Sequence, residues 1–153
     1  MLQIERLNES NVSGAAELEK NNFSNPWSIE ALSAEINNPY ALYLVVKDVS
    51  ETGEESVIAM AGLIISYDTA DVANVSVSEK YRRQNIAYDL LTKLMYEGRQ
   101  IGVKDFTLEV RENNAPARNL YEKLGFKYEG TRPNFYTNPN EGAAIYWLRT
   151  KEV

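Results

Sequence analysis

A polar loop with two arginines lies between an apolar alternating stretch and an amphipathic stretch in the middle of the chain. The alternating stretch ends at residues 75–77, and apolar residues at helical spacing begin at Ile86. This order predicts strand, loop, helix. Unpaired N–H groups at a helix N-terminus bind anions, above all phosphate, and Arg82 and Arg83 add positive charge there. The residues therefore predict a phosphate-binding loop.

The available acids and bases are limited, because the chain contains no cysteine and no histidine. Thiol nucleophiles, disulfides, imidazole bases and Ser-His-Asp triads are excluded. Any catalytic acid or base must be a carboxylate, a tyrosine, a lysine, a chain terminus or water. No dense acidic cluster has the spacing of a metal site, so no metal is expected.

Composition indicates one soluble domain of 153 residues with 44% hydrophobic residues. The sequence contains no signal peptide and no apolar run long enough to span a membrane, so we expect a cytoplasmic protein. A net charge of −6 disfavours direct nucleic-acid binding. The acidity is compatible with a cationic partner, such as an amine or a basic protein tail, or with a contribution to solubility alone.

The elements that must position the loop follow from periodicity and turn signals. We predict strands over 3–7, 40–47, 57–67, 72–77, 105–110, 126–130 and 143–149. We predict helices from Ser10 or Asn11 to about 21, from Ser28 to 36, from Ile86 to about 102, and from Asn113 to 124. Turns are expected at 50–55 and 68–71, and a polar, aromatic loop at 132–142.

The order of these elements predicts an α+β fold. Three successive strands with short connections between residues 40 and 77 indicate an antiparallel meander, and later helices provide crossovers. We therefore expect a single mixed, mostly antiparallel sheet. Gly62, in the middle of the strand predicted over 57–67, indicates a bulge or a close contact.

Two motifs in this order resemble those of the GCN5-related N-acetyltransferase (GNAT) superfamily. That family has Gln/Arg-x-x-Gly-x-Gly/Ala between a strand and a helix, which stands here as Arg82-Arg83-Gln84-Asn85-Ile86-Ala87. Its second marker, Asn-x-x-Ala-x-x-Leu-Tyr-x-x-Leu-Gly-Phe, is matched in full from Asn114 to Phe126. The resemblance covers essentially the whole chain and implies one GNAT domain over residues 1–153, with helices on both faces of the sheet. Asn85 departs from the glycine usual in the family.

A narrower resemblance is to the RimI type, which acetylates the N-terminal alanine of small-subunit ribosomal protein eighteen. Asn25-Pro26-Trp27-Ser28 resembles that group's Phe-Pro-Trp-Ser, and residues 108–114 resemble its Leu-Glu-Val-Arg-x-x-Asn. Residues 132–136 resemble its Arg-x-Asn-Tyr-Tyr. Glu141-Gly142-Ala143 departs from the usual Glu-Asp-Ala, a difference that concerns substrate identity more than the chemistry.

The resemblance implies direct acetyl transfer from acetyl-CoA to the N-terminus of a protein, here a basic ribosomal protein, without a metal. Glu109 matches the general base position and Tyr121 the general acid position. Strand and loop backbone groups would pair with pantetheine and pyrophosphate. The implied coenzyme-binding residues are Val75, Ser76, Val77, Arg82, Arg83, Gln84, Asn85, Ile86, Ala87 and Asn114, and those of a peptide groove are Trp27, Phe135 and Tyr136.

Each of these residues also has an ordinary structural interpretation. The arginines could be solvated, Tyr121 could be a core residue, Glu109 could lie on a strand surface, and Trp27 could only pack. Two other functions stay open: a GNAT enzyme for another peptide or a small amine, and an acyl-CoA-binding module without turnover. Glu109 and Tyr121 argue against the module, because a protein that only binds needs neither.

Overall fold

One seven-stranded sheet organises the chain, in the order β1-β2-β3-β4-β5-β7-β6. The structure, a computed structural model, describes residues 1–150. Neighbouring strands run antiparallel except β4 and β5, which run parallel. The predicted α+β class and mixed sheet are therefore confirmed. The strands are β1 (Leu2–Arg6), β2 (Ala41–Val49), β3 (Glu55–Ser66), β4 (Thr69–Val77), β5 (Asp105–Arg111), β6 (Lys127–Tyr136) and β7 (Glu141–Leu148).

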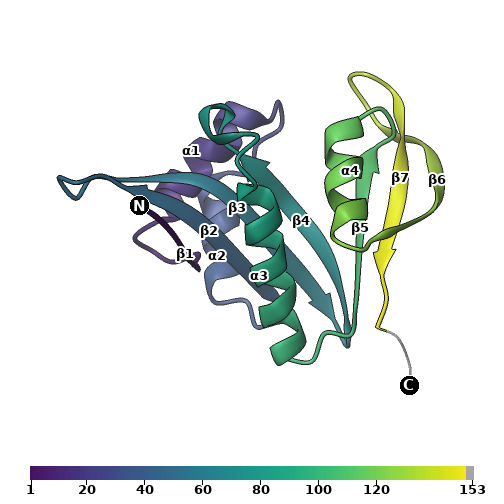
Figure 1. Cartoon of the computed structure of the whole chain (residues 1–153), viewed down its shortest axis with the longest axis horizontal. Helices are drawn as coiled ribbons and strands as arrows, with labels where there is room; N and C mark the ends of the chain where they lie inside the picture. The colour runs from purple at the N-terminus through teal and green to yellow at the C-terminus, as the bar shows by residue number, and fades with distance from the viewer. Residues whose placement is uncertain (151–153) are drawn as a thin grey trace.

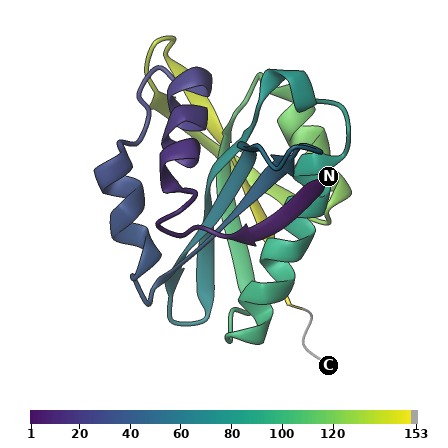
Figure 2. The ribbon, with the colours of Figure 1, turned by 90° about the vertical axis from the view of Figure 1, so that its left-hand side faces the viewer.

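Helices cover both faces of the sheet, as Figure 2 shows. The helices are α1 (Val12–Asn22), α2 (Ile29–Ile36), α3 (Ile86–Gln100) and α4 (Ala115–Lys123). Under α1 and α2, one apolar cluster includes Leu18, Leu32 and Met60. Under α3 and α4, a larger one includes Leu94 and Phe106. Two cores, one on each face, hold the sheet between them as a rigid central layer.

The sheet opens between β4 and β5. These strands pair at three positions only, from Thr69↔Asp105 to Asp71↔Thr107. Beyond that point they diverge, and Figure 1 shows the gap widening toward the C-terminal ends of both strands. One edge of β4 is consequently not covered by β5 over its last six residues. A pair of parallel strands that diverges in this way leaves backbone hydrogen-bonding groups unpaired in the middle of the sheet.

A bulge in β4 accompanies the opening. The register between β3 and β4 shifts between Met60 and Gly62, and Asn74 has a left-handed φ of 57°. A Cβ atom on Gly62 would lie 2.3 Å from Cε2 of Tyr43. Gly62 therefore marks both features predicted for it, a bulge and a close contact, because only a residue without a side chain leaves room for the Tyr43 ring.

Three boundaries predicted from the sequence are wrong. The turn after β3 comprises only Tyr67 and Asp68, so β4 already begins at Thr69. Residues 132–136 belong to β6, where Arg132 pairs with Ala143 and Tyr136 with Glu141. Proline and asparagine made this stretch look like a loop, but pairing with β7 outweighs these local preferences, with an irregular register between the two pairs.

The third wrong boundary concerns the start of α4, which is capped by Asn114 and not by Asn113. The side-chain oxygen of Asn114 accepts a hydrogen bond from the N–H of Ala117 at 3.2 Å. Ser28 caps α2 in the same way through Ala31, as predicted. Within residues 1–150, no helix combines the length and the apolar character needed to cross a membrane.

Candidate active site at the opening of the sheet

The open edge of β4 presents alternate backbone groups. The N–H of Ser78 donates to the carbonyl of Ile58 in β3. Because direction alternates along a strand, Ser76 also faces β3, whereas Val75 and Val77 face the opening. The expectation that all three would offer backbone groups to a ligand is therefore wrong for Ser76, whose backbone lies opposite Met60.

The carbonyl of Val77 is already bonded within the protein. The Asn22 side-chain amide donates to it at 3.0 Å, and Nε of Arg82 donates to it at 3.2 Å. Arg82 therefore folds back onto β4, while Arg83 has no such bond in the described part of the chain. The sequence placed both arginines together as phosphate ligands, but the structure gives them different surroundings.

The loop between β4 and α3 forms a cradle of free amides. Among residues 1–150, the N–H groups from Arg83 to Tyr88 have no hydrogen-bond acceptor. Arg83 and Asn85 both take left-handed backbone conformations, with φ of 64° and 60°. Left-handed residues turn successive N–H groups inward, and the α3 dipole adds positive potential at the same place. The arrangement suits an anion such as a pyrophosphate.

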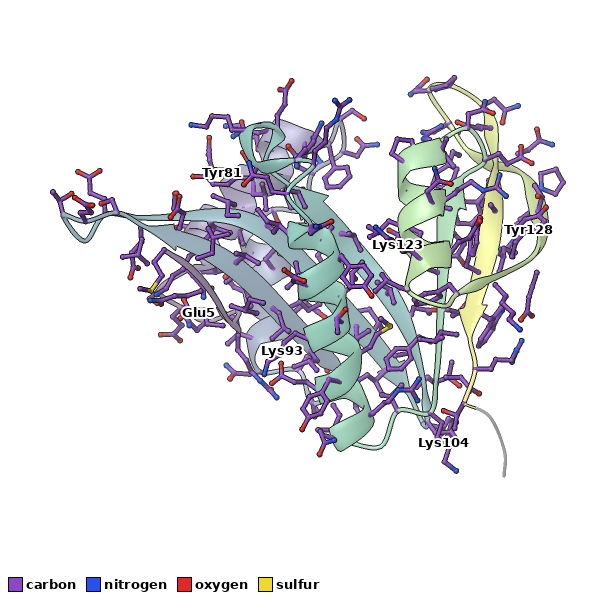
Figure 3. All side chains as sticks on the ribbon, viewed as in Figure 1. Glu5, Tyr81, Lys93, Lys104, Lys123 and Tyr128 are labelled. Atoms are coloured by element: carbon purple, nitrogen blue, oxygen red, sulfur yellow. The ribbon has the colours of Figure 1, made fainter. Side chains whose placement is uncertain are left out.

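A groove of about 640 Å³ runs from this cradle to α4. It brings together most of the predicted coenzyme-binding residues: Val77, Arg82, Arg83, Asn85, Ile86, Ala87 and Asn114. Val75, Ser76 and Gln84 are not part of its lining. Lys123, on the side of α4 that faces α3 (Figure 3), adds a cation that the sequence did not single out, with Nζ 5.9 Å from the ring centre of Tyr88.

The left-handed conformation of Asn85 leads to a first prediction. Asparagine tolerates the left-handed region better than other residues with a Cβ, whereas alanine at that φ costs roughly 1 kcal/mol. We expect Asn85→Ala to lower the free energy of unfolding by about that amount in urea titrations, and Asn85→Gly to leave it equal or higher. Coenzyme A affinity, measured by calorimetry, should also be equal or better in Asn85→Gly. A sharp loss of affinity in Asn85→Gly would show that the asparagine side chain itself binds the ligand.

Glu109 lies across the opening from β4, in the part of β5 that has diverged from β4. Its neighbours Leu108 and Val110 are buried on the other face, while the Glu109 side chain points away from that core and reaches solvent. Loss of water around the carboxyl group raises its pKa, and the negative charge of Asp71 raises it further, against an opposing effect of Arg132. A carboxylate with a raised pKa is a stronger base than an ordinary one.

Tyr121, on α4, is only 7% exposed. Its ring packs edge-on against Phe126, with centroids 6.0 Å apart. The hydroxyl makes no hydrogen bond within residues 1–150, yet it is not among the fully enclosed unpartnered oxygens, so it reaches an accessible surface. Burial, followed by the effect of Tyr136, raises the pKa of Tyr121 to about 12. The phenol therefore keeps its proton at neutral pH and is available as a donor.

Tyr136, near the end of β6, connects these two groups. Burial raises its pKa first, and the charge of Glu109 raises it further. Since Tyr136 also contributes to the raised pKa of Tyr121, both Glu109 and Tyr121 lie within electrostatic reach of Tyr136. The structure thus brings Glu109, Tyr121 and Tyr136 to one place, from β5, α4 and β6.

Arg111 holds Tyr136 there, and sequence reasoning missed this role. Its guanidinium carbon lies 4.5 Å from the Tyr136 ring centre, and its two Nη atoms donate to the carbonyls of Pro139 and Thr137, both at 2.9 Å. It also pairs with Glu141 at 3.2 Å. The signal in the sequence was the position of Arg111 two residues after Glu109, which places both on one face of β5.

Trp27 and Phe135, the other two predicted groove residues, are both partly exposed. Trp27 lies in the loop between α1 and α2, with its ring 6.3 Å from that of Tyr43, and Phe135 packs on Tyr136 at 4.9 Å. Of these two residues, only Phe135 therefore contacts one of the three central groups, Tyr136. Among residues 1–150, no group of three or more acidic, histidine or cysteine side chains has the arrangement of a metal site.

Comparison with known protein families shows to which family this chain belongs. The model of the acetyltransferase (GNAT) family matches residues 12–126. The chain belongs to the GNAT family. The left-handed Asn85 and the free amides after it are thus this chain's version of the GNAT loop between strand and helix.

Individual GNAT relatives cover nearly the whole chain. A putative ribosomal protein bS18-alanine N-acetyltransferase of Bacillus subtilis is 31% identical, over 89% of this chain and 87% of its own. The Escherichia coli ribosomal protein bS18-alanine N-acetyltransferase is 30% identical over 97% of both chains.

Solved structures agree with these sequence relatives. The crystal structure of the ribosomal-protein-S18-alanine N-acetyltransferase from Escherichia coli superposes with a TM-score of 0.86 at 29% identity, covering 100% of this chain and 96% of that one. Arabidopsis thaliana NAA60 in complex with acetyl-CoA has a TM-score of 0.84 at 17% identity, covering 97% of this chain and 98% of that one, and shares the fold. The predicted resemblance to GNAT enzymes of the RimI type is confirmed.

Proposed function

We propose that this GNAT enzyme transfers the acetyl group of acetyl-CoA directly to the N-terminal α-amine of a protein, the alanine of ribosomal protein bS18. The observation that carries the proposal is that Glu109 and the protonated phenol of Tyr121 both lie within electrostatic reach of Tyr136, where β5 has diverged from β4. The relatives named for this reaction, similar over nearly the full chain, supply the substrate. The reaction places the enzyme in the cytoplasm.

Acetyl-CoA supplies an activated thioester, and the protein supplies binding and proton transfer. Backbone groups of Val75 and Val77 pair with pantetheine, while the amides from Arg83 to Tyr88 hold the pyrophosphate. The carbonyl of Val77 becomes available to pantetheine only when Asn22 and Arg82 release it. Asn114, whose side-chain oxygen caps α4, keeps its amide group for the coenzyme.

The chemistry requires two proton movements. An N-terminal amine has a pKa near 8, so about a tenth of it is neutral and nucleophilic at pH 7. Glu109 accepts the proton that the nitrogen loses as it forms the amide bond. The carbon–sulfur bond breaks at the same carbonyl carbon, and Tyr121 gives its proton to the departing thiolate. Products are the acetylated N-terminus and coenzyme A.

The charge of the enzyme suits this acceptor. With a net charge of −6, the protein attracts a basic ribosomal protein and repels nucleic acid. Trp27, Phe135 and Tyr136 form the walls that receive the peptide. Of these three residues, Tyr136 has the most firmly fixed position, because the Arg111 side chain packs on its ring.

Labelled acetyl-CoA offered with a panel of acceptors tests the proposal. The panel contains N-terminal peptides that begin with different residues, including the bS18 N-terminus, and small amines such as polyamines. We expect turnover of the alanine-led ribosomal peptide. Turnover restricted to other peptides or to amines would establish a different GNAT acceptor, and coenzyme binding without any turnover would establish a binding module.

Arginine substitutions test the phosphate cradle, the second prediction. We expect Arg83→Ala to weaken coenzyme A binding about tenfold, because one charge-assisted contact to phosphate is lost. The Arg82→Ala, Arg83→Ala double variant should be weaker still, while pantetheine, which lacks the pyrophosphate, should bind Arg83→Ala and the parent alike. Calorimetry provides the comparison, with Arg6→Ala on β1 as the control. Equal affinity in the double variant would refute the cradle.

A further inference from the structure

Two side chains in the last turn of α1 form hydrogen bonds to β4. Glu19 and Asn22, three residues apart on the helix, project from the same face. Asn22 donates to the hydroxyl of Ser76 and to the carbonyl of Val77. Glu19, only 1% exposed, accepts a bond from the side-chain amide of Asn74 at 2.9 Å. The contacts fall on the bulge and on the final residues of β4.

Glu19 also reaches the loop between α1 and α2. The Oε1 atom that accepts from Asn74 also accepts from the backbone N–H of Trp27 at 3.4 Å. One carboxylate oxygen therefore joins the bulge of β4 to the loop that carries Trp27. The other oxygen, Oε2, is buried and has no partner among residues 1–150.

Asn74 is held from both sides. Its amide nitrogen donates to Glu19, and its oxygen accepts from the Tyr43 hydroxyl at 2.8 Å. This residue has the left-handed backbone that produces the bulge. A left-handed residue in a strand persists only where its surroundings fix it, and these two bonds supply that constraint. The bulge in turn sets where Val75 and Val77 present their backbone groups.

Stability alone does not account for a carboxyl group at this position. Burial raises the pKa of Glu19 against the opposing effect of its hydrogen bonds, so desolvation outweighs them. One oxygen is unpartnered, so the carboxyl group is buried without full compensation by hydrogen bonds. The group contributes a hydrogen-bond acceptor at a defined point instead.

We infer that Glu19 is a positioning residue for both halves of the site: its Oε1 atom fixes the Asn74 bulge that shapes the coenzyme strand and the Trp27 backbone in the acceptor wall. The inference rests on the proposed acetyl-CoA reaction. It assigns Glu19 no contact with substrate or coenzyme. The role requires an oxygen acceptor and no negative charge.

Four variants test this role, with coenzyme A affinity by calorimetry as a readout that is independent of the acceptor. Glu19→Gln keeps an oxygen acceptor, and Glu19→Met keeps the volume alone. Asn74→Gly keeps the left-handed backbone but removes the side chain, and Tyr43→Phe removes only the second bond to Asn74. We expect Glu19→Met and Asn74→Gly each to weaken coenzyme A binding about tenfold, and Glu19→Gln to stay within about threefold of the parent.

The double variant Glu19→Met, Asn74→Gly should bind no worse than the weaker single variant, because both changes break the same bond. Thermal unfolding checks that Glu19→Met remains folded at the temperature of the binding assay, since the Asn74 amide left without its acceptor lowers the melting temperature. Parent-like coenzyme affinity in Glu19→Met, failure of Glu19→Gln to restore affinity, or multiplicative losses in the double variant would each overturn the inference. A parent protein that does not bind coenzyme A would instead refute the proposed function.

Discussion

Tyr121→Phe is expected to lower kcat about a hundredfold while leaving coenzyme A affinity unchanged. Loss of a general acid costs a factor of about 10² to 10⁴, and a thiolate released without a proton is the less favourable product. With its pKa raised to about 12, the phenol is fully protonated at neutral pH. Steady-state kinetics with the bS18 peptide, together with calorimetry, measures both quantities.

The fold should tolerate this change. The Tyr121 ring packs against Phe126 and Tyr146 and its hydroxyl makes no hydrogen bond within residues 1–150, so phenylalanine retains the packing. We expect the free energy of unfolding to change by less than roughly 0.5 kcal/mol. Tyr96→Phe, at an exposed position on α3, is the matched control and should keep full activity. Parent-like kcat in Tyr121→Phe would mean that water or another group protonates the thiolate.

Glu109→Gln is expected to lower kcat/KM by about two orders of magnitude at neutral pH, since it removes the base. The pH dependence makes the test sharper. Both a carboxylate and a neutral amine are needed, so activity falls as pH falls through the amine pKa near 8. It falls again through the Glu109 pKa, which burial and Asp71 raise above its ordinary value.

The slope of log kcat/KM against pH distinguishes these two ionisations. On the acid side it should be about one between the two pKa values and about two below both, because two protons then block the reaction. Glu109→Gln should show the slope of one throughout. Glu51→Gln, in the exposed turn between β2 and β3, should reproduce the parent profile. An unchanged profile and rate in Glu109→Gln would assign the proton to a water chain.

Local sequence patterns were sufficient for the fold and the coenzyme loop. Apolar periodicity located the α-helices and the strands, apart from the second half of β6, because burial on one face forces a period of two or 3.6 residues. Asn85, at the position where the family has glycine, adopts a left-handed conformation, because tolerance of that region belongs to the residue itself. The match from Asn114 to Phe126 likewise placed Tyr121 on a helix.

Which of these residues act together depends on contacts between distant parts of the chain. Tyr136 was expected in a loop, but pairing with β7 puts it in β6 beside Glu109. The Arg111–Glu141 pair spans 30 positions of sequence, and Glu19 reaches Asn74 across 55. Such pairs leave no periodic trace, because their partners are brought together by the way the sheet opens between β4 and β5. Local sequence signals therefore specify the elements and the chemistry of the loop, while the long-range packing of helices on a split sheet specifies the geometry of the site.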